Sequence, residues 1–227
     1  MKRTYIHNAR IVNEGQTFCG AIVIEDQVIA EVLGQGEQPS APCDETIDAQ
    51  GMYLIPGVID DHVHFRDPGL THKADMHTES QAAAAGGVTS YMDMPNTNPQ
   101  TTTLEALEGK FQDAATKSLV NYSFYFGATN NNAHLLPQLD KRKVCGVKLF
   151  MGASTGNMLV DRMETLKNIF AHAGMLIATH CEDQHIISAN AAAYKEKYGD
   201  DPDVKYHPEI RSEEACYQSS SLAVQLA

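Results

Sequence analysis

The sequence predicts an α/β protein with a parallel sheet, preceded by a small β unit. From residue 53 onward, apolar stretches alternate with helical ones, a pattern typical of parallel strands joined by short crossovers. Polar side chains follow most of the apolar stretches, at the end of the strand where a parallel barrel carries its chemistry. Periodicity alone leaves a closed barrel and an open sheet as alternatives.

The predicted β unit covers residues 1–52, and the predicted α/β unit covers residues 53–227. Residues 1–52 contain short runs rich in Ile and Val that glycines interrupt, as in strands joined by turns. In the α/β unit, strands are expected at 54–60, 88–94, 120–127, 146–151 and 176–180. Helices are expected between and after them, at 73–85, 103–117, 161–173, 184–197 and 212–227.

The composition excludes several classes of protein. The 227 residues are 43% hydrophobic with a net charge of −12, which is enough apolar material for a substantial core. No cluster of Lys and Arg offers a phosphate footprint, so no nucleic-acid partner is expected. No signal-peptide core and no long apolar run is present, so no membrane partner is expected. The five scattered cysteines predict a reducing, cytoplasmic setting.

Several predicted strands end in polar side chains that would meet at one edge of the sheet. His62 and His64 end an apolar run that predicts a buried strand, Asn96 follows the second strand, and His180 ends the fifth. Because His62 and His64 stand two residues apart, both imidazoles project to the same side of an extended chain and can reach one metal ion. Imidazole suits zinc and its neighbours. The pattern favours a metal site over a polar surface loop.

Lys148 lies inside the apolar run "CGVKLFM" of the fourth strand. Such a lysine either extends its ammonium group to water or is a desolvated, functional amine. Burial lowers the pKa of a lysine because a low-dielectric environment disfavours the ammonium form. A neutral amine can react with carbon dioxide to give a carbamate, an anionic oxygen ligand that is able to bridge two metals.

Three acidic residues near the strand ends each have two interpretations. Asp93 is either an acceptor behind a metal ligand or a structural residue. Glu182 and Asp183 either orient His180 or cap the helix that follows, and the cap is favoured.

Four motifs resemble those of the dihydroorotases in the amidohydrolase superfamily, in order and in spacing: "PGVIDDHVHFRDPG", "DMPNTNP", "GVKLFMGAS" and "THCED". The resemblance implies a (β/α)8 TIM-type barrel, of which about the first five β/α units are present, with the N-terminal part of a small β-sandwich domain. It also implies a binuclear metal centre, usually of zinc. The implied reaction is the reversible cyclisation of N-carbamoyl-L-aspartate to L-dihydroorotate in pyrimidine biosynthesis.

The resemblance assigns metal-binding roles to four residues of this sequence. His62 and His64 would bind the more buried metal, a carboxylated Lys148 would bridge both metals, and His180 would bind the second. One branch of the family uses an aspartate from the loop after the lysine strand instead. That loop here reads "GASTGNML", which contains no acid and therefore favours the lysine. Zinc, manganese and cobalt all accept such ligands.

The resemblance also implies that Arg66 and Asn96 hold the carboxylate of the substrate. A guanidinium group grips a carboxylate in a two-pronged, charge-assisted contact. Dihydropyrimidinase and hydantoinase substrates lack the ring carboxylate, and allantoinases are similar to "HVHFNEPG" where this sequence has "HVHFRDPG". Arg66 therefore favours a dihydroorotase over these cyclic amidohydrolases, which are the alternatives.

Two functional residues of the family have no counterpart in this sequence. The family has a further metal-binding histidine at strand six and an aspartate at strand eight that serves as general base. We expect both residues beyond Ala227. His185 and His207 are expected to have other roles. We therefore expect the chain to be the N-terminal portion of a longer enzyme, and this portion alone to be inactive.

A non-catalytic, dihydroorotase-like scaffold for aspartate transcarbamoylase is the alternative from a different functional class. The metal-binding and carboxylate-binding residues are all present, which favours the enzyme. A homodimer is common in the family, and aspartate transcarbamoylase is a candidate partner.

Overall fold

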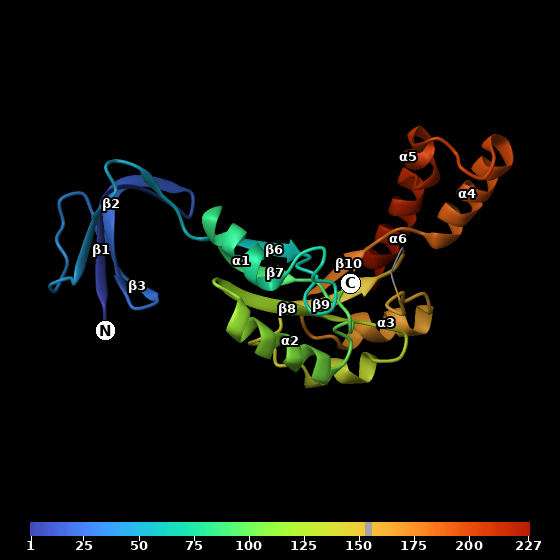
Figure 1. The fold of residues 1–227 in the computed structure, drawn as a ribbon, viewed down its shortest axis with the longest axis horizontal. Helices are drawn as coiled ribbons and strands as arrows, with labels where there is room; N and C mark the ends of the chain where they lie inside the picture. The colour runs from blue at the N-terminus through green and yellow to red at the C-terminus, as the bar shows by residue number, and fades with distance from the viewer. Residues whose placement is uncertain (153–155) are drawn as a thin grey trace. The chain divides into compact units, whose positions relative to one another are not determined.

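The computed structural model describes residues 1–152 and 156–227, so part of the loop "GASTGNML" lies outside the described residues. The chain divides into two compact units, Met1–Gly57 and Val58–Ala227. Each unit has its own five-stranded sheet (Figure 1).

The first unit is a mixed sheet built around one long strand. Its strands are β1 (Arg3–Asn13), β2 (Gln16–Glu25), β3 (Val28–Gly34), β4 (Glu45–Asp48) and β5 (Tyr53–Leu54). The order is β3-β2-β1-β4, and β5 also pairs with β1. β2 is antiparallel to both β1 and β3, whereas β4 and β5 are parallel to β1. A small core of Ala9, Ile11, Ile22 and Ala49 stabilises this sheet.

The second unit contains an all-parallel sheet, as the alternation of strands and helices predicts, and it forms part of the (β/α) barrel that the family resemblance implies. Its strands are β6 (Val58–Val63), β7 (Val88–Asp93), β8 (Asn121–Gly127), β9 (Gly146–Phe150) and β10 (Ile177–His180). They lie side by side in chain order, so each crossover leads to the neighbouring strand. All their carboxyl ends therefore meet at one edge of the sheet.

Side chains cap the first turn of four helices of the second unit. The helices are α1 (Met76–Ala85), α2 (Leu104–Lys117), α3 (Met163–His172), α4 (Gln184–Tyr198), α5 (His207–Ile210) and α6 (Glu213–Leu226), with 3-10 turns η1 (Ala133–Gln138) and η2 (Val204–Tyr206). Asp75, Thr103, Asp183 and Ser212 each accept hydrogen bonds from the first turn of α1, α2, α4 and α6, respectively. The cap at Asp75 explains why α1 begins at Met76, three residues after the predicted start.

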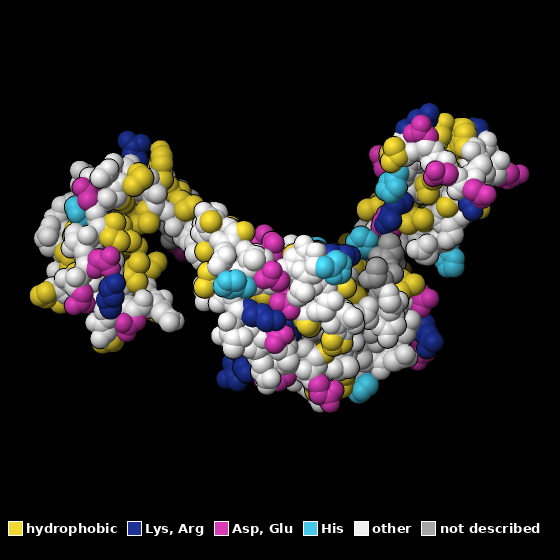
Figure 2. Space-filling view, in the orientation of Figure 1, with side chains coloured by type: hydrophobic (Ala, Val, Ile, Leu, Met, Phe, Trp, Pro, Cys, Tyr) yellow, Lys and Arg dark blue, Asp and Glu magenta, His cyan; other side chains and the backbone are white. Residues whose placement is uncertain are grey.

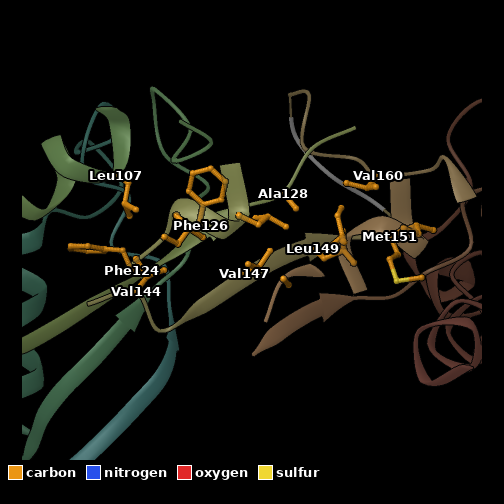
Figure 3. Packing of buried hydrophobic residues seen from close by; sticks show 14 of the residues in the cluster. Leu107, Phe124, Phe126, Ala128, Val144, Val147, Leu149, Met151 and Val160 are labelled. Carbon is orange, nitrogen blue, oxygen red and sulfur yellow. The ribbon is translucent and has the colours of Figure 1, made fainter. Parts of the chain in front are cut away.

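The main core lies between the central strands and the helices of the second unit (Figure 3). Phe124 and Phe126 of β8 and Val147 and Leu149 of β9 are fully buried. They pack with residues such as Leu107 of α2, which covers β8. Removal of this apolar surface from water is the main stabilising term for the sheet.

The first strand of this sheet differs from the prediction in both bounds and burial. The expected strand at 54–60 is β6 at Val58–Val63, because Tyr53–Leu54 pairs with β1 instead. β6 is exposed rather than buried, and Ile59 retains 60% of its accessible surface. It is an edge strand, with β7 on one side and no other described strand on the opposite side. His62 consequently lies within the strand rather than after it.

None of the described helices combines the length and the apolar character that crossing a membrane requires. On the face that Figure 2 shows, Lys and Arg side chains are scattered among Asp and Glu. Cys19, Cys43, Cys145, Cys181 and Cys216 are all free thiols.

Candidate functional site

His62 and His64 lie close together at the carboxyl end of β6. Their ring centroids are 5.4 Å apart. Partial burial of the ring, followed by the nearby charges of Arg66, His62 and Lys148, lowers the pKa of His64 to about 4. An imidazole with this pKa is neutral near pH 7, and the neutral imidazole is the form that binds a metal ion.

Arg66 and Asn96 meet where the turn after β6 contacts the loop after β7. The guanidinium Nη1 of Arg66 donates a hydrogen bond of 3.3 Å to the main-chain oxygen of Asn96. The main-chain N–H of Asn98 donates to the oxygen of Pro68, at 3.0 Å. A Cβ on Gly69, whose φ is 81°, would collide with the main chain of Asn98, so only glycine permits this approach.

Both residues of this pair carry features that are common at ligand-binding sites. Arg66 has a φ of 60°, in the left-handed region that costs a non-glycine residue on the order of 1–3 kcal/mol. The side-chain oxygen of Asn96 is buried, and no described residue provides a hydrogen bond to it. An unpaired buried oxygen is costly, so a ligand that donates a hydrogen bond to this oxygen would gain binding free energy.

Lys148 is buried in β9 with 3% of its surface exposed. Its Nζ lies 5.2 Å from the centre of the Phe150 ring, and it forms no ion pair with any described residue. Burial lowers the pKa of Lys148, which favours the neutral amine. The side chain therefore does not extend to water, and of the two interpretations the desolvated amine matches the structure.

His180, at the end of β10, contacts a carboxylate that an arginine holds in turn. The Nε2 of His180 is 3.0 Å from the Oε2 of Glu182. Arg211 donates from Nε to the Oε1 of Glu182 at 2.8 Å, and from Nη2 to its Oε2. These contacts, above all the one with Arg211, lower the pKa of Glu182. Asp183 caps α4, so the two acids divide the roles that the sequence left open.

A buried ion pair supports the turn that carries His64 and Arg66. The Nζ of Lys110 is 2.6 Å from the Oδ2 of Asp93, and both side chains are almost completely buried. Lys110 also donates to the main-chain oxygen of Met94 at 3.0 Å. The Oδ1 of Asp93 accepts a hydrogen bond of 3.0 Å from the main-chain N–H of Phe65. Asp93 is therefore a structural anchor for the residue directly after His64.

The strand ends bring some of the predicted site residues together. The charge of Lys148 contributes to the lowered pKa of His64, although β7 and β8 lie between the strands that carry these two residues. In the β9–β10 ladder Lys148 pairs with Ala178 and Phe150 pairs with His180, so Lys148 and His180 are on the same face.

The imidazoles alone do not complete a metal site. Within residues 1–152 and 156–227, no group of three His, Cys, Asp or Glu side chains is close enough to hold a metal ion. His62 and His64 provide two donors, and a carboxylated Lys148 would provide a third. Because Nε2 of His180 faces Glu182, Nδ1 is the nitrogen that remains for a metal, and metal-binding histidines commonly make this kind of contact with a carboxylate.

Sequence reasoning did not identify Lys110 or Arg211. A lysine in the amphipathic α2 pattern and an arginine between two helices resemble ordinary surface residues, and only tertiary contacts show their partners. The signal that was available is Asp93, an acid at a strand end that requires a partner if it is buried.

Comparison with known proteins shows the family. The sequence model described as "Dihydro-orotase-like" matches residues 51–199, so this chain belongs to the dihydroorotase-like family. The match confirms the resemblance on which the predicted barrel rests.

The similar proteins include several kinds of cyclic amidohydrolase. An allantoinase from Deinococcus radiodurans is 37% identical over 163 residues, which are 68% of this chain and 35% of that protein. A dihydroorotase from Methanosarcina mazei is 37% identical over 188 residues, which are 81% of this chain and 40% of that protein. The solved L-hydantoinase (dihydropyrimidinase) from Arthrobacter aurescens has a TM-score of 0.90 at 28% identity, covering 100% of this chain and 50% of that one. The chain thus spans half or less of each relative.

Removal of Lys110 is expected to destabilise the protein far more than removal of an exposed lysine. Lys110→Met leaves the buried Asp93 carboxylate uncompensated, which costs about 3–5 kcal/mol in the free energy of unfolding. Lys195→Met, which breaks an exposed pair with Asp200, costs about 0–1 kcal/mol. Urea unfolding measures both.

The double variant Asp93→Asn/Lys110→Met removes both charges and is expected to be more stable than Lys110→Met alone. Equal stability losses for Lys110→Met and Lys195→Met would contradict the assignment of a buried ion pair.

Proposed function

We propose that this chain is part of a metal-dependent dihydroorotase, which reversibly cyclises N-carbamoyl-L-aspartate to L-dihydroorotate in pyrimidine biosynthesis. The observation that carries the proposal is the position of Arg66 against Asn96, beside the neutral His64. A cation at this position suits a substrate with a carboxylate, and among the cyclic amides considered the dihydroorotate ring has one. Because the chain spans half or less of its relatives, the proposal concerns the activity of the intact protein.

Arg66 and Asn96 would bind the substrate carboxylate together. One nitrogen of the guanidinium holds the main-chain oxygen of Asn96, which fixes the group and leaves its other N–H donors for a ligand. The Nδ2 of the Asn96 amide can donate a hydrogen bond to this carboxylate, and its Oδ1, which is buried without a described partner, can accept one from an N–H of the same ligand. Charge-assisted contacts of this kind orient a substrate as well as bind it.

The metal-binding residues in the proposal are His62, His64, a carboxylated Lys148 and His180. Carboxylation starts from the neutral amine: the nitrogen lone pair forms a bond to the carbon of carbon dioxide, one C=O π bond opens with its electron pair moving onto oxygen, and the nitrogen releases a proton to water. Burial of Lys148 favours the neutral amine that this step requires. When bound, two divalent ions such as zinc would polarise the ring amide and activate a water molecule.

The surrounding charges support the modification of Lys148. Arg66, Lys110 and Lys148 all contribute positive charge at His64. A carbamate at Lys148 carries a negative charge and would attract the neighbouring cations rather than repel them. It also supplies the oxygen donor that two imidazoles alone lack.

Allantoinase is the second candidate function, because an allantoinase is among the similar proteins at 37% identity. The substrate would then lack the ring carboxylate, and Arg66 would need another partner. A cytoplasmic location, a homodimer and a complex with aspartate transcarbamoylase remain predictions that accompany the proposal.

The substrate class can be tested on the intact protein with L-dihydroorotate, allantoin, hydantoin and dihydrouracil. We expect turnover of L-dihydroorotate and little turnover of the other three. Arg66→Met should lower kcat/KM for L-dihydroorotate about 10- to 100-fold, because a charge-assisted contact contributes about 1.5–3 kcal/mol.

Arg142→Met is a matched control, since Arg142 lies in the turn before β9, at the opposite end of the strand from the site, and should leave kcat/KM unchanged. Preferential turnover of allantoin, or an Arg66→Met variant that hydrolyses L-dihydroorotate as well as the unaltered protein, would overturn the dihydroorotase assignment.

The role of Lys148 can be tested through metal content rather than activity. The intact protein should bind close to two equivalents of zinc, and Lys148→Ala should bind fewer because the bridging oxygen ligand is absent. Short carboxylic acids should restore part of the zinc binding to Lys148→Ala by occupying the same space.

Elemental analysis after dialysis measures the zinc content. Lys143→Ala, which removes a lysine from the turn before β9, is the control and should bind as much zinc as the unaltered protein. If Lys148→Ala also bound the same amount, the carbamate would play no part in metal binding.

A further inference from the structure

Glu182 joins two residues that come from separate parts of the second unit. On one side its Oε2 is 3.0 Å from the Nε2 of His180, the last residue of β10. On the other side both carboxylate oxygens accept hydrogen bonds from Arg211, which lies between α5 and α6. Three side chains thus form a continuous line from the strand end to the α5–α6 turn.

The segment around Glu182 is fixed against the neighbouring strand end. The main chain of Glu182 passes so close to Gly152, just after β9, that a Cβ on Gly152 would collide with it. The main-chain N–H of the following residue, Asp183, donates to the oxygen of Ala215 in α6 at 2.8 Å. Glu182 is therefore held between the end of β9 and the start of α6.

The turn that carries Arg211 is fixed as well. The side-chain amide of Asn190 in α4 donates to the main-chain oxygens of Glu209 at 3.3 Å and Ile210 at 3.1 Å. Ser212, the next residue after Arg211, caps α6. Contacts from two helices thus fix the main chain on both sides of Arg211, which limits the positions that its guanidinium group can reach.

The pair formed by Arg211 and Glu182 differs from an ordinary surface ion pair. Arg142 makes the same two-pronged contact with Asp140, but Arg142 is 89% exposed, its partner is two residues away, and neither touches a histidine. The Glu182 side chain is only 17% exposed, and Arg211 is 35% exposed. Partial removal from water strengthens such contacts.

We propose that Arg211 is a positioning residue for His180 and acts through Glu182. A carboxylate bound to a guanidinium group is ionised and can only accept hydrogen bonds, so the nitrogen of His180 that faces it must carry the proton. Nε2 is that nitrogen, and in the neutral ring Nδ1 is left with a free lone pair. Arg211 thereby selects the form of His180 that offers Nδ1 to a divalent cation. That the ligand is a metal ion rests on the proposed function.

The tautomer of His180 can be measured in the intact protein by nitrogen-15 NMR of labelled histidine, after the metal has been removed with a chelator. The signals of His180 are assigned from their loss in His180→Gln. We expect the Nε2–H form in the unaltered protein and in Arg142→Met, and a mixture of the two tautomers in Arg211→Met. A pure Nε2–H form in Arg211→Met would overturn the proposal.

Zinc titration of the same variants provides the second measurement. We expect Arg211→Met to weaken the binding of one zinc equivalent by about 10- to 100-fold, and Arg142→Met to leave it unchanged. Unaltered zinc binding in Arg211→Met, together with a pure Nε2–H form, would refute the positioning role while the proposed function stood. The expected tautomers could also be found in a protein that neither binds zinc nor turns over L-dihydroorotate. That result would refute the proposed function and leave the positioning role of Arg211 intact.

Glu182→Gln provides a test that does not depend on the folding of Arg211→Met. A glutamine amide can donate as well as accept, so it removes the reason for a proton on Nε2. We expect the mixed tautomers and the weaker zinc binding in this variant too, and the Nε2–H form alone would contradict the proposal.

Discussion

The buried ion pair between Asp93 and Lys110 is the interaction on which the site depends. It joins the end of β7 to α2, and the second oxygen of Asp93 holds the main-chain N–H of Phe65. Residues on either side of Phe65 are His64 and Arg66, so one carboxylate fixes the main chain between a predicted metal ligand and a predicted substrate contact. Breaking such a pair leaves an unpaired charge in a low-dielectric environment, which makes this arrangement difficult to alter without loss of stability.

Several cations act on His64 of the histidine pair at the strand ends. Partial burial of the ring, together with the charges of Arg66, Lys148 and Lys110, lowers the pKa of His64 and favours its neutral imidazole. Asp93 is engaged by Lys110, and the Glu182 carboxylate is engaged by Arg211, so these acids do not neutralise Arg66 or Lys148. A site of this kind attracts anions. A carbamate on Lys148 and a substrate carboxylate at Arg66 are both anions. The proposed carboxylation of Lys148 and the proposed carboxylate-bearing substrate therefore support each other.

Local sequence was sufficient to predict the elements that repeat and the residues that end them. The alternation of strands and helices predicted the parallel sheet, which placed His64 and His180 at strand ends and Lys148 inside a strand, whereas His62 lies within β6 rather than after it. What local sequence did not reveal depends on distant partners: Lys110 looks like a surface lysine until Asp93 is placed beside it. The exposure of β6 was also missed, because an apolar run does not show whether a neighbouring strand covers it.

Anomalous diffraction at the zinc edge, from crystals of the intact protein, tests the central claim most directly. The account predicts two anomalous peaks at the carboxyl ends of the strands, one between His62, His64 and Lys148, and the other between Lys148 and His180. Continuous electron density for a carbamate should join Lys148 to both peaks. Zinc-loaded crystals without anomalous signal at these strand ends would contradict the account.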